Sequence, residues 1–291
     1  MAAELCENGE AVARAAGQLS SRPLGGLPAA DARHHAIKEG KMNDEHYTGL
    51  IAEWYDDWLA ARTDDVDFYC TFFDRFRGRV LELACGTGRL LLPIAKRGVV
   101  IHGLDISEDM LHVLRGKASA LQLDGIEVYQ QPMEDFSLPA TFDAIFVASG
   151  SFQLLTLRES AMRSLRCIRD HLAEDGFFLA DIFIPWDAIV ARERSAYHVT
   201  RDVVRPDGKR SIVLERFTID LPLQQKLGSY RYEFYDHKRL VSCIADDLAI
   251  RWYWKDEFLS LLAESGFSRV ETLAESPLYK EGHSFVVKAS K

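Results

Sequence analysis

Length, composition and charge exclude several classes of protein before any motif is considered. The chain has 291 residues, 47% of them hydrophobic, which is enough for a large core. Its formal net charge of −9 argues against nucleic acid as the principal partner, because phosphate binding needs a basic surface. No apolar run reaches the ~18 residues of a membrane span, and the 5 scattered cysteines form neither a zinc motif nor a disulfide framework. We therefore expect a cytoplasmic protein with no membrane, nucleic-acid or metal partner.

The first 41 residues contain no aromatic residue and are rich in alanine. This composition predicts a flexible extension over residues 1–41, in which Glu10–Leu19 is the one candidate helix. Apolar residues then recur at helical spacing from Leu50 to Leu59 and from Val66 to Phe76. We expect residues 42–78 to form helices that cover a ligand site in the domain that follows.

Strands and helices alternate from residue 79 onward. Five strand-like segments end at Leu83, Asp105, Gln130, Ala148 and Ile184, with helical patterns between them, and two more at 268–273 and 284–288 are expected to close the sheet. This alternation predicts an α/β fold with a doubly wound, mostly parallel, seven-stranded sheet that carries helices on both faces. Ligands of such sheets bind beyond the C-terminal ends of the strands.

The pattern changes between residues 196 and 253. Four strand-like segments follow one another there with turns between them and no long helix: 199–204, 211–220, 229–235 and 245–253. They predict an antiparallel β insertion after the fifth strand, flanked by core segments 79–195 and 254–291. We expect one face of this insertion to act as a lid over the site.

A glycine-rich turn joins the first strand to its helix. It reads ACGTG at 84–88, and these small residues let the backbone approach a ligand closely. A dinucleotide site shares the G-x-G and the acid Asp105 at the end of the next strand. However, Leu91 stands at the third small-residue position, and Glu82 interrupts the first strand. An NAD-dependent oxidoreductase is therefore kept only as an alternative.

Taken together, these motifs resemble class I S-adenosylmethionine-dependent methyltransferases of the small-molecule type. The resemblance spans residues 47–291 and rests on ELACGTG at 82–88, LDIS at 104–107, MEDF at 133–136, FDAI at 142–145 and HLAEDG at 171–176. It implies the Rossmann-like methyltransferase fold and S-adenosyl-L-methionine as the cofactor, with Asp105 on both ribose hydroxyls. The other cofactor contacts we expect are Tyr55, Glu82, Ala84, Gly86, Thr87, Gly88, Ile106, Met110, Met133, Glu134 and Ala148.

The acceptor is less well defined by the sequence. The resemblance implies methylation at N or O of a small molecule, such as an amino sugar, an amino acid or a natural-product intermediate. We expect it to contact Tyr47, Ser151, Gln153 and Tyr232. Methyl transfer mainly requires positioning in a dry pocket, so residue types leave the catalytic group unknown, with Tyr55, Gln153 and Tyr232 as candidates.

Several alternatives stay open at this point. Pro132 has no N–H donor, so recognition of the adenine amino group is left to Glu134, Asp135 or a backbone carbonyl. His198, His237 and His283 are considered as bases but fit surface positions better. A catalytically silent protein that uses this fold for binding, and a homodimer, are also compatible with the sequence.

Overall fold

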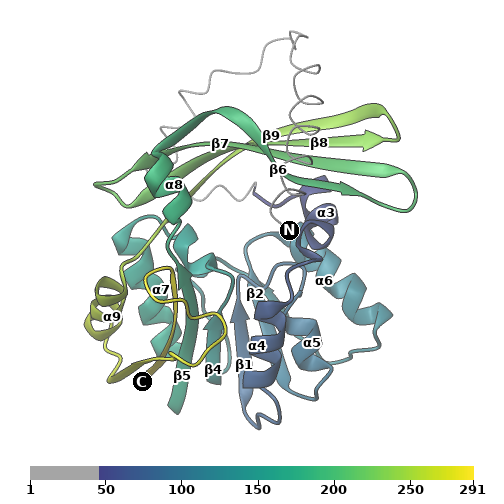
Figure 1. Ribbon diagram of the computed structural model, residues 1–291. Coiled ribbons are helices and arrows are strands. Elements are labelled where there is room, and N and C mark those ends of the chain that lie inside the picture. Colours follow the sequence, from purple (N-terminus) through teal and green to yellow (C-terminus); the bar gives the residue numbers. More distant parts are fainter. Residues whose placement is uncertain (1–45) are drawn as a thin grey trace. The chain divides into compact units, whose positions relative to one another are not determined.

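The computed structural model describes residues 46–291 and contains two β-sheets in this range (Figure 1). The expected extension at 1–41, with its helix at Glu10–Leu19, lies outside the described residues. Among residues 46–291, no helix combines the length and the apolar character needed to cross a membrane.

The larger sheet has seven strands in the order β10-β11-β5-β4-β1-β2-β3. The parallel strands are β1 (Arg79–Leu83), β2 (Val100–Asp105), β3 (Val128–Gln130), β4 (Phe142–Val147) and β5 (Leu172–Phe183). The antiparallel strands are β10 (Arg269–Thr272) and β11 (Ser284–Ser290). Chain order reverses between β1 and β4, which is where a doubly wound sheet opens a ligand crevice. The expected mostly parallel, seven-stranded sheet is confirmed.

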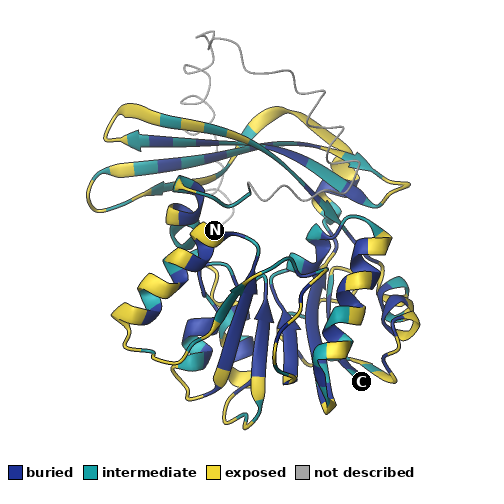
Figure 2. Ribbon diagram, turned by 180° about the vertical axis from the view of Figure 1, so that it is seen from behind, coloured by how far each residue is buried: buried dark blue, intermediate teal, exposed yellow. Residues whose placement is uncertain are grey.

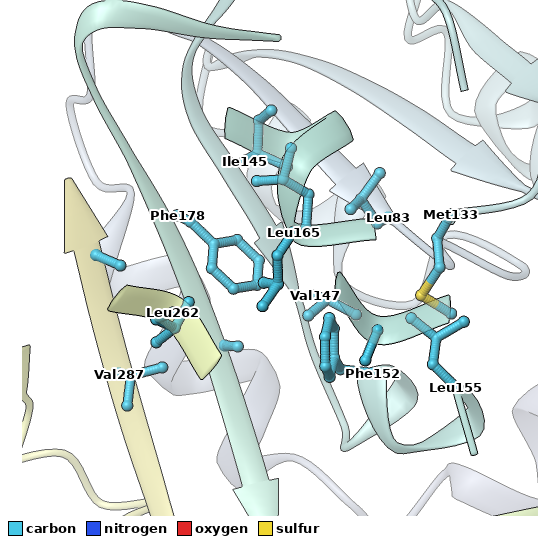
Figure 3. Packing of buried hydrophobic residues seen from close by; sticks show 14 of the residues in the cluster. Leu83, Met133, Ile145, Val147, Phe152, Leu155, Leu165, Phe178, Leu262 and Val287 are labelled. Carbon is cyan, nitrogen blue, oxygen red and sulfur yellow. The ribbon is translucent and has the colours of Figure 1, made fainter. Parts of the chain in front are cut away.

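Helices cover both faces of this sheet and produce two hydrophobic clusters. On one face, α7 (Arg158–His171) and α9 (Lys255–Glu264) pack against residues such as Leu81 and Phe178. On the other face lie α4 (Asp64–Phe72), α5 (Leu91–Ala95) and α6 (Glu108–Ala120). Figure 3 shows part of the first cluster, and Figure 2 shows buried strands between helices whose outer faces are exposed. Because both faces of the central strands are buried, their sequences are almost continuously apolar.

The second sheet is the expected antiparallel insertion, and it follows β5 and a short helix that the sequence did not predict, α8 (Trp186–Ala191). Its strands pair in chain order: β6 (Glu193–Val204), β7 (Lys209–Asp220), β8 (Gln225–Asp236) and β9 (Arg239–Arg251). The strands are longer than predicted. Backbone pairing extends β8 back to Gln225 through Gly228, where the residue types do not favour a strand.

Helix α3 (Leu50–Leu59) packs directly on the inserted sheet. Its buried Trp54 packs near Phe234 and under the guanidinium of Arg205, whose carbon lies 3.7 Å from the ring centroid. Its Trp58 Nε1 donates to Ser211 Oγ at 3.1 Å. The opposite side of α3 is tied to the core, because Asp56 accepts hydrogen bonds from Thr87 Oγ1 and Lys117 Nζ. Helix α3 therefore joins the inserted sheet to the glycine turn.

Candidate active site

A cavity opens at the C-terminal ends of β1, β2 and β4, next to the point between β1 and β4 where the strand order reverses and a ligand site is expected. It holds about 700 Å³ of atom-free space, part of it open to solvent. Residues from the core, from the segment before and within α3, and from the inserted sheet line it together: His46, Tyr47, Tyr55, Ala84, Gly86, Leu104, Asp105, Ile106, Met110, Gln131, Met133, Ser151, Leu154 and Leu248.

The turn after β1 contributes backbone to this cavity. Ala84, Gly86 and Gly88 have positive φ angles of 52°, 52° and 77°, a conformation that favours glycine. A Cβ atom added to Gly86 would meet nothing within 4 Å, so its Cα faces open space. A Cβ added to Gly88 would lie 2.8 Å from the Leu114 side chain. Gly86 therefore leaves room for a ligand, whereas Gly88 allows the turn to pack on α6.

Asp105 ends β2 with its carboxylate at the cavity wall. Its Oδ2 accepts the Gly86 N–H at 2.8 Å, and its Oδ1 accepts the Ser107 N–H at 2.9 Å. Burial raises the pKa of Asp105, and the N–H donors of Ser107, Gly86 and Ile106 oppose that rise. Each oxygen retains a further lone pair, so the carboxylate is held rigidly and can still accept two hydroxyl groups of a ligand.

Glu82 lies within β1, on the strand that leads into the turn. The carboxyl group is buried, and its Oε2 has no hydrogen-bond partner among the described residues. Burial raises the pKa of Glu82 well above its ordinary value, although the charge of Arg89 lowers it and that of Asp105 raises it further. A buried acceptor without a donor is costly, so this position suits a ligand that brings a cationic or N–H group.

Apolar side chains from the segments that follow β2 and β3, including the start of α6, form another wall. Ile106, Met110 and Met133 line the cavity there and can flank a flat ring. Glu134 follows Met133, and its buried Oε2 has no hydrogen-bond partner among residues 46–291. Gln131, which was not among the residues predicted for the site, lines the cavity directly after β3.

Two tyrosines form the side of the cavity nearest α3. The rings of Tyr47 and Tyr55 meet edge to face, with centroids 5.8 Å apart. The segment before α3, which contains Tyr47, is fixed to the core because Ser107 Oγ donates to the Tyr47 carbonyl at 2.9 Å. Burial raises the pKa of both phenols, and for Tyr47 the charges of Tyr55 and Tyr232 add to the effect. Both phenols are therefore neutral at physiological pH, and both residues line the cavity.

The inserted sheet reaches the cavity through β9. Leu248 lines it directly, and Asp246 Oδ2 lies 2.8 Å from Nδ1 of His46, which also lines it. His46 was not among the histidines considered from the sequence. Its partner is 200 residues away along the chain, so no local pattern marks the pair.

Nine of the residues predicted for the site line this cavity: Tyr47, Tyr55, Ala84, Gly86, Asp105, Ile106, Met110, Met133 and Ser151. Seven do not: Glu82, Thr87, Gly88, Glu134, Ala148, Gln153 and Tyr232. Glu82 is the buried acid described above, and Glu134 is a half-buried acid of which the Oε2 atom is buried. Thr87 donates its hydroxyl to Asp56 at 2.6 Å, and Ala148 is packed in the second core cluster.

Gln153 lies in the short 3₁₀ helix η1 (Ser151–Leu154) but is fully buried away from the cavity. Its Nε2 donates to the carbonyls of Phe183 and Arg251, and its Oε1 accepts the Phe183 N–H at 3.0 Å. With its amide engaged in this way, Gln153 is a structural link and not a group available to a substrate. Tyr232 packs on Trp58 with ring centroids 5.4 Å apart, in the cluster between α3 and the inserted sheet.

The three histidines considered from the sequence lie elsewhere. His237 is exposed beside Asp236, and His198 has its Nε2 3.8 Å from Glu215 Oε2 on the inserted sheet. His283 and His198 line a second, more open cavity with Trp186. Within the described part of the chain, no group of three or more His, Cys, Asp or Glu side chains is arranged to hold a metal ion.

Comparison with known proteins finds a methyltransferase domain in part of the core. A family model described as a methyltransferase domain matches residues 80–176. A protein of Geobacillus sp. (strain WCH70), whose name gives only the class methyltransferase, is 27% identical over 212 residues, which are 68% of this chain and 76% of that protein.

Two relatives from Streptomyces have names that specify an acceptor. The cypemycin N-terminal methyltransferase of Streptomyces sp. is 29% identical over 52% of this chain. The dTDP-3-amino-3,6-dideoxy-alpha-D-glucopyranose N,N-dimethyltransferase of Streptomyces fradiae is 27% identical over 53% of it. The matches span 58% and 59% of these two proteins, respectively.

The fold is shared over a larger part of the chain. The crystal structure of Streptomyces venezuelae DesVI superposes with a TM-score of 0.65, covering 83% of this chain and 99% of that one. The sequence identity is 22%, so this likeness establishes the fold alone.

Proposed function

Because the chain belongs to the class I S-adenosylmethionine-dependent methyltransferases, we propose that it methylates an amine nitrogen of a small molecule. The observation that carries this proposal is the composition of the cavity. A glycine turn and a backbone-anchored Asp105 form one side, and Tyr47, Tyr55 and His46 form the other. The first side suits the cofactor, and the second suits an amine.

The residues of the first side fit S-adenosylmethionine. When bound, this cofactor supplies an electrophilic methyl group on a sulfonium sulfur. Asp105 is placed to accept the ribose hydroxyls, and Gly86 leaves the space that a close ligand needs. Glu82 offers a buried acceptor for the amino group of the methionine part, while Met133 and Ile106 can enclose the adenine. The unpartnered Oε2 of Glu134 is our choice for the adenine amino group.

The second side favours an amine over a neutral hydroxyl. Aromatic faces and a nearby carboxylate attract a cationic nitrogen, and Tyr47, Tyr55 and Asp246 supply both features. The two Streptomyces relatives described above are also named for amine acceptors, an N-terminus and an amino sugar. An amino sugar, an amino acid or another small natural-product amine is therefore the acceptor class that we propose.

The parts around the cavity receive matching roles. We assign residues 79–195 and 254–291 to cofactor binding, and residues 42–78 and 196–253 to the cover that excludes water from the reaction. Ser151 and Tyr47 remain our proposed acceptor contacts, and Tyr55 is shared with the cofactor. Three further statements stay predictions from the sequence. They are a cytoplasmic location, a possible homodimer, and the absence of a nucleic-acid partner.

Calorimetry with S-adenosylhomocysteine and with NAD tests the cofactor. We expect S-adenosylhomocysteine to bind and NAD not to bind, and the reverse result would replace the proposal with an oxidoreductase. Incubation with methyl-labelled S-adenosylmethionine and a panel of amino sugars, amino acids and short peptides then tests the acceptor. Binding of the cofactor product with no transfer to any member would favour a silent binding protein instead.

A further inference from the structure

A histidine–carboxylate pair lies at the edge of the cavity, between the segment before α3 and the inserted sheet. Nδ1 of His46 is 2.8 Å from Oδ2 of Asp246, and the two side chains are 16% and 21% exposed. An ionised carboxylate can only accept a hydrogen bond, so Nδ1 of His46 carries the proton. The other ring nitrogen, Nε2, then keeps its lone pair and is a proton acceptor in neutral imidazole.

The other titratable groups near His46 are poorly suited to take a proton. Burial raises the pKa of Tyr47 and Tyr55 on the α3 side, and of Tyr230 and Tyr232 on β8. These phenols stay protonated at neutral pH and can donate but do not act as bases. Asp105 on β2, held by two backbone N–H groups, is the residue that we assign to the ribose hydroxyls of the cofactor, so it is not available to the acceptor.

We propose that His46, oriented by Asp246, is the proton acceptor for the substrate amine. An alkylammonium cannot attack a methyl group, because its nitrogen has no lone pair. When one N–H bond breaks, its electron pair stays on nitrogen and the proton forms a bond to Nε2 of His46. The imidazolium that results is stabilised by the Asp246 carboxylate, and the amine is left neutral and nucleophilic.

This inference rests on the proposed function and makes it more specific. A base is needed when the acceptor enters the cavity as a cation, which is the state of an aliphatic amine at neutral pH. The aromatic rings of Tyr47 and Tyr55 also favour that cation on entry. The acceptor class that this inference favours is therefore an aliphatic amine, because an aromatic or amide nitrogen is not protonated at this pH and would need no base to free its lone pair.

Sinefungin tests the pair without an identified acceptor. In this analogue a carbon that bears an ammonium group replaces the methylated sulfur, whereas S-adenosylhomocysteine has no group there. We expect wild-type protein to bind sinefungin at least tenfold more tightly than S-adenosylhomocysteine, because the ammonium donates to Nε2 of His46. His46→Phe should remove this preference, His46→Gln should retain part of it through its amide oxygen, and Asp246→Asn should reduce it several-fold.

The outcomes separate the two proposals. S-adenosylhomocysteine should bind all variants within about twofold of wild type, which also shows that they fold. His237→Gln is the control, because this histidine is exposed on the inserted sheet away from the cavity. If S-adenosylhomocysteine fails to bind wild-type protein, the proposed function is wrong. If it binds and His46→Phe keeps the sinefungin preference, the role of His46 is wrong.

The tautomer gives a second readout that is independent of any ligand. In protein labelled with ¹⁵N-histidine, the His46 resonances are those missing from the spectrum of His46→Gln. We expect the neutral ring to carry its proton on Nδ1 in wild-type protein and to lose this strict preference in Asp246→Asn. A proton on Nε2 in wild-type protein would place a donor in the cavity and overturn the inference.

Discussion

The cofactor side and the acceptor side of the cavity are built in opposite ways. On the cofactor side, the hydrogen bond from Gly86 to Asp105 joins residues only 19 positions apart, and backbone groups do much of the positioning. On the acceptor side, His46 and Asp246 are separated by 200 positions, and side chains from two distant segments define the surface. Local sequence therefore determines the first side, whereas tertiary packing determines the second. The two sides should respond differently to mutation.

The largest expected effect comes from separating α3 from the inserted sheet. Trp54→Ala should lower the free energy of unfolding by about 3–5 kcal/mol, because it empties a buried site between Phe234 and Arg205. Urea unfolding of the variant measures this loss, and Trp54→Phe is the matched control that keeps an aromatic ring. A change below 1 kcal/mol would mean that α3 contributes little to holding the inserted sheet.

Removal of the Asp105 carboxylate should act on the cofactor side alone. Asp105→Ala should weaken S-adenosylhomocysteine binding more than tenfold, because a charge-assisted contact worth about 1.5–3 kcal/mol is lost. Calorimetry measures the affinity, and Asp124→Ala is the control because Asp124 is exposed in the loop before β3. Unchanged affinity for Asp105→Ala would place the cofactor elsewhere.

Substitution of Gln153 tests whether this residue has a structural role or a binding role. Gln153→Leu should destabilise the protein by about 1–3 kcal/mol, since Phe183 and Arg251 each lose a buried partner. The affinity for S-adenosylhomocysteine should stay within about twofold, because the side chain does not reach the cavity. Thermal unfolding and calorimetry on the same samples check both statements. A selective loss of affinity would return Gln153 to the binding surface.

The smallest effect concerns pH. The pKa of Glu82 is raised by burial, so the folded protein binds its proton more tightly than the unfolded chain does. The resulting stability is fully present below the unfolded pKa and is lost as pH rises through the folded pKa. Glu82→Gln should therefore gain stability relative to wild type as the pH rises above the ordinary pKa of a glutamate, measured by urea unfolding without cofactor. The affinity of Glu82→Gln for S-adenosylhomocysteine should also fall. If the difference in stability between the variant and wild type does not change with pH, the pKa of Glu82 is not raised by burial.

Much of the fold and half of the cavity could be predicted because their signals are local. Alternating strands and helices gave the seven-stranded sheet, and the antiparallel insertion followed from a run of strands without helices. The turn at 84–88 and Asp105 were found for the same reason. His46 was missed because a lone histidine before a helix carries no local signal of its partner on β9. Gln153 was selected from its position after β4, which does not show that its amide faces Phe183 and Arg251.

The link made by Gln153 also bears on how the acceptor side can change. The chain leaves the core after Phe183 and returns at Arg251, and one amide nitrogen donates to the carbonyls of both residues. The two positions at which the chain passes between the core and the inserted sheet are thus held close together. Closely spaced ends are a property of domains whose insertion into another protein is tolerated. Replacing the segment between these two positions with that of a relative need not stretch or re-register the core strands. Grafting at Phe183 and Arg251, with Gln153 retained, is the route by which a new acceptor specificity could be combined with the existing cofactor site.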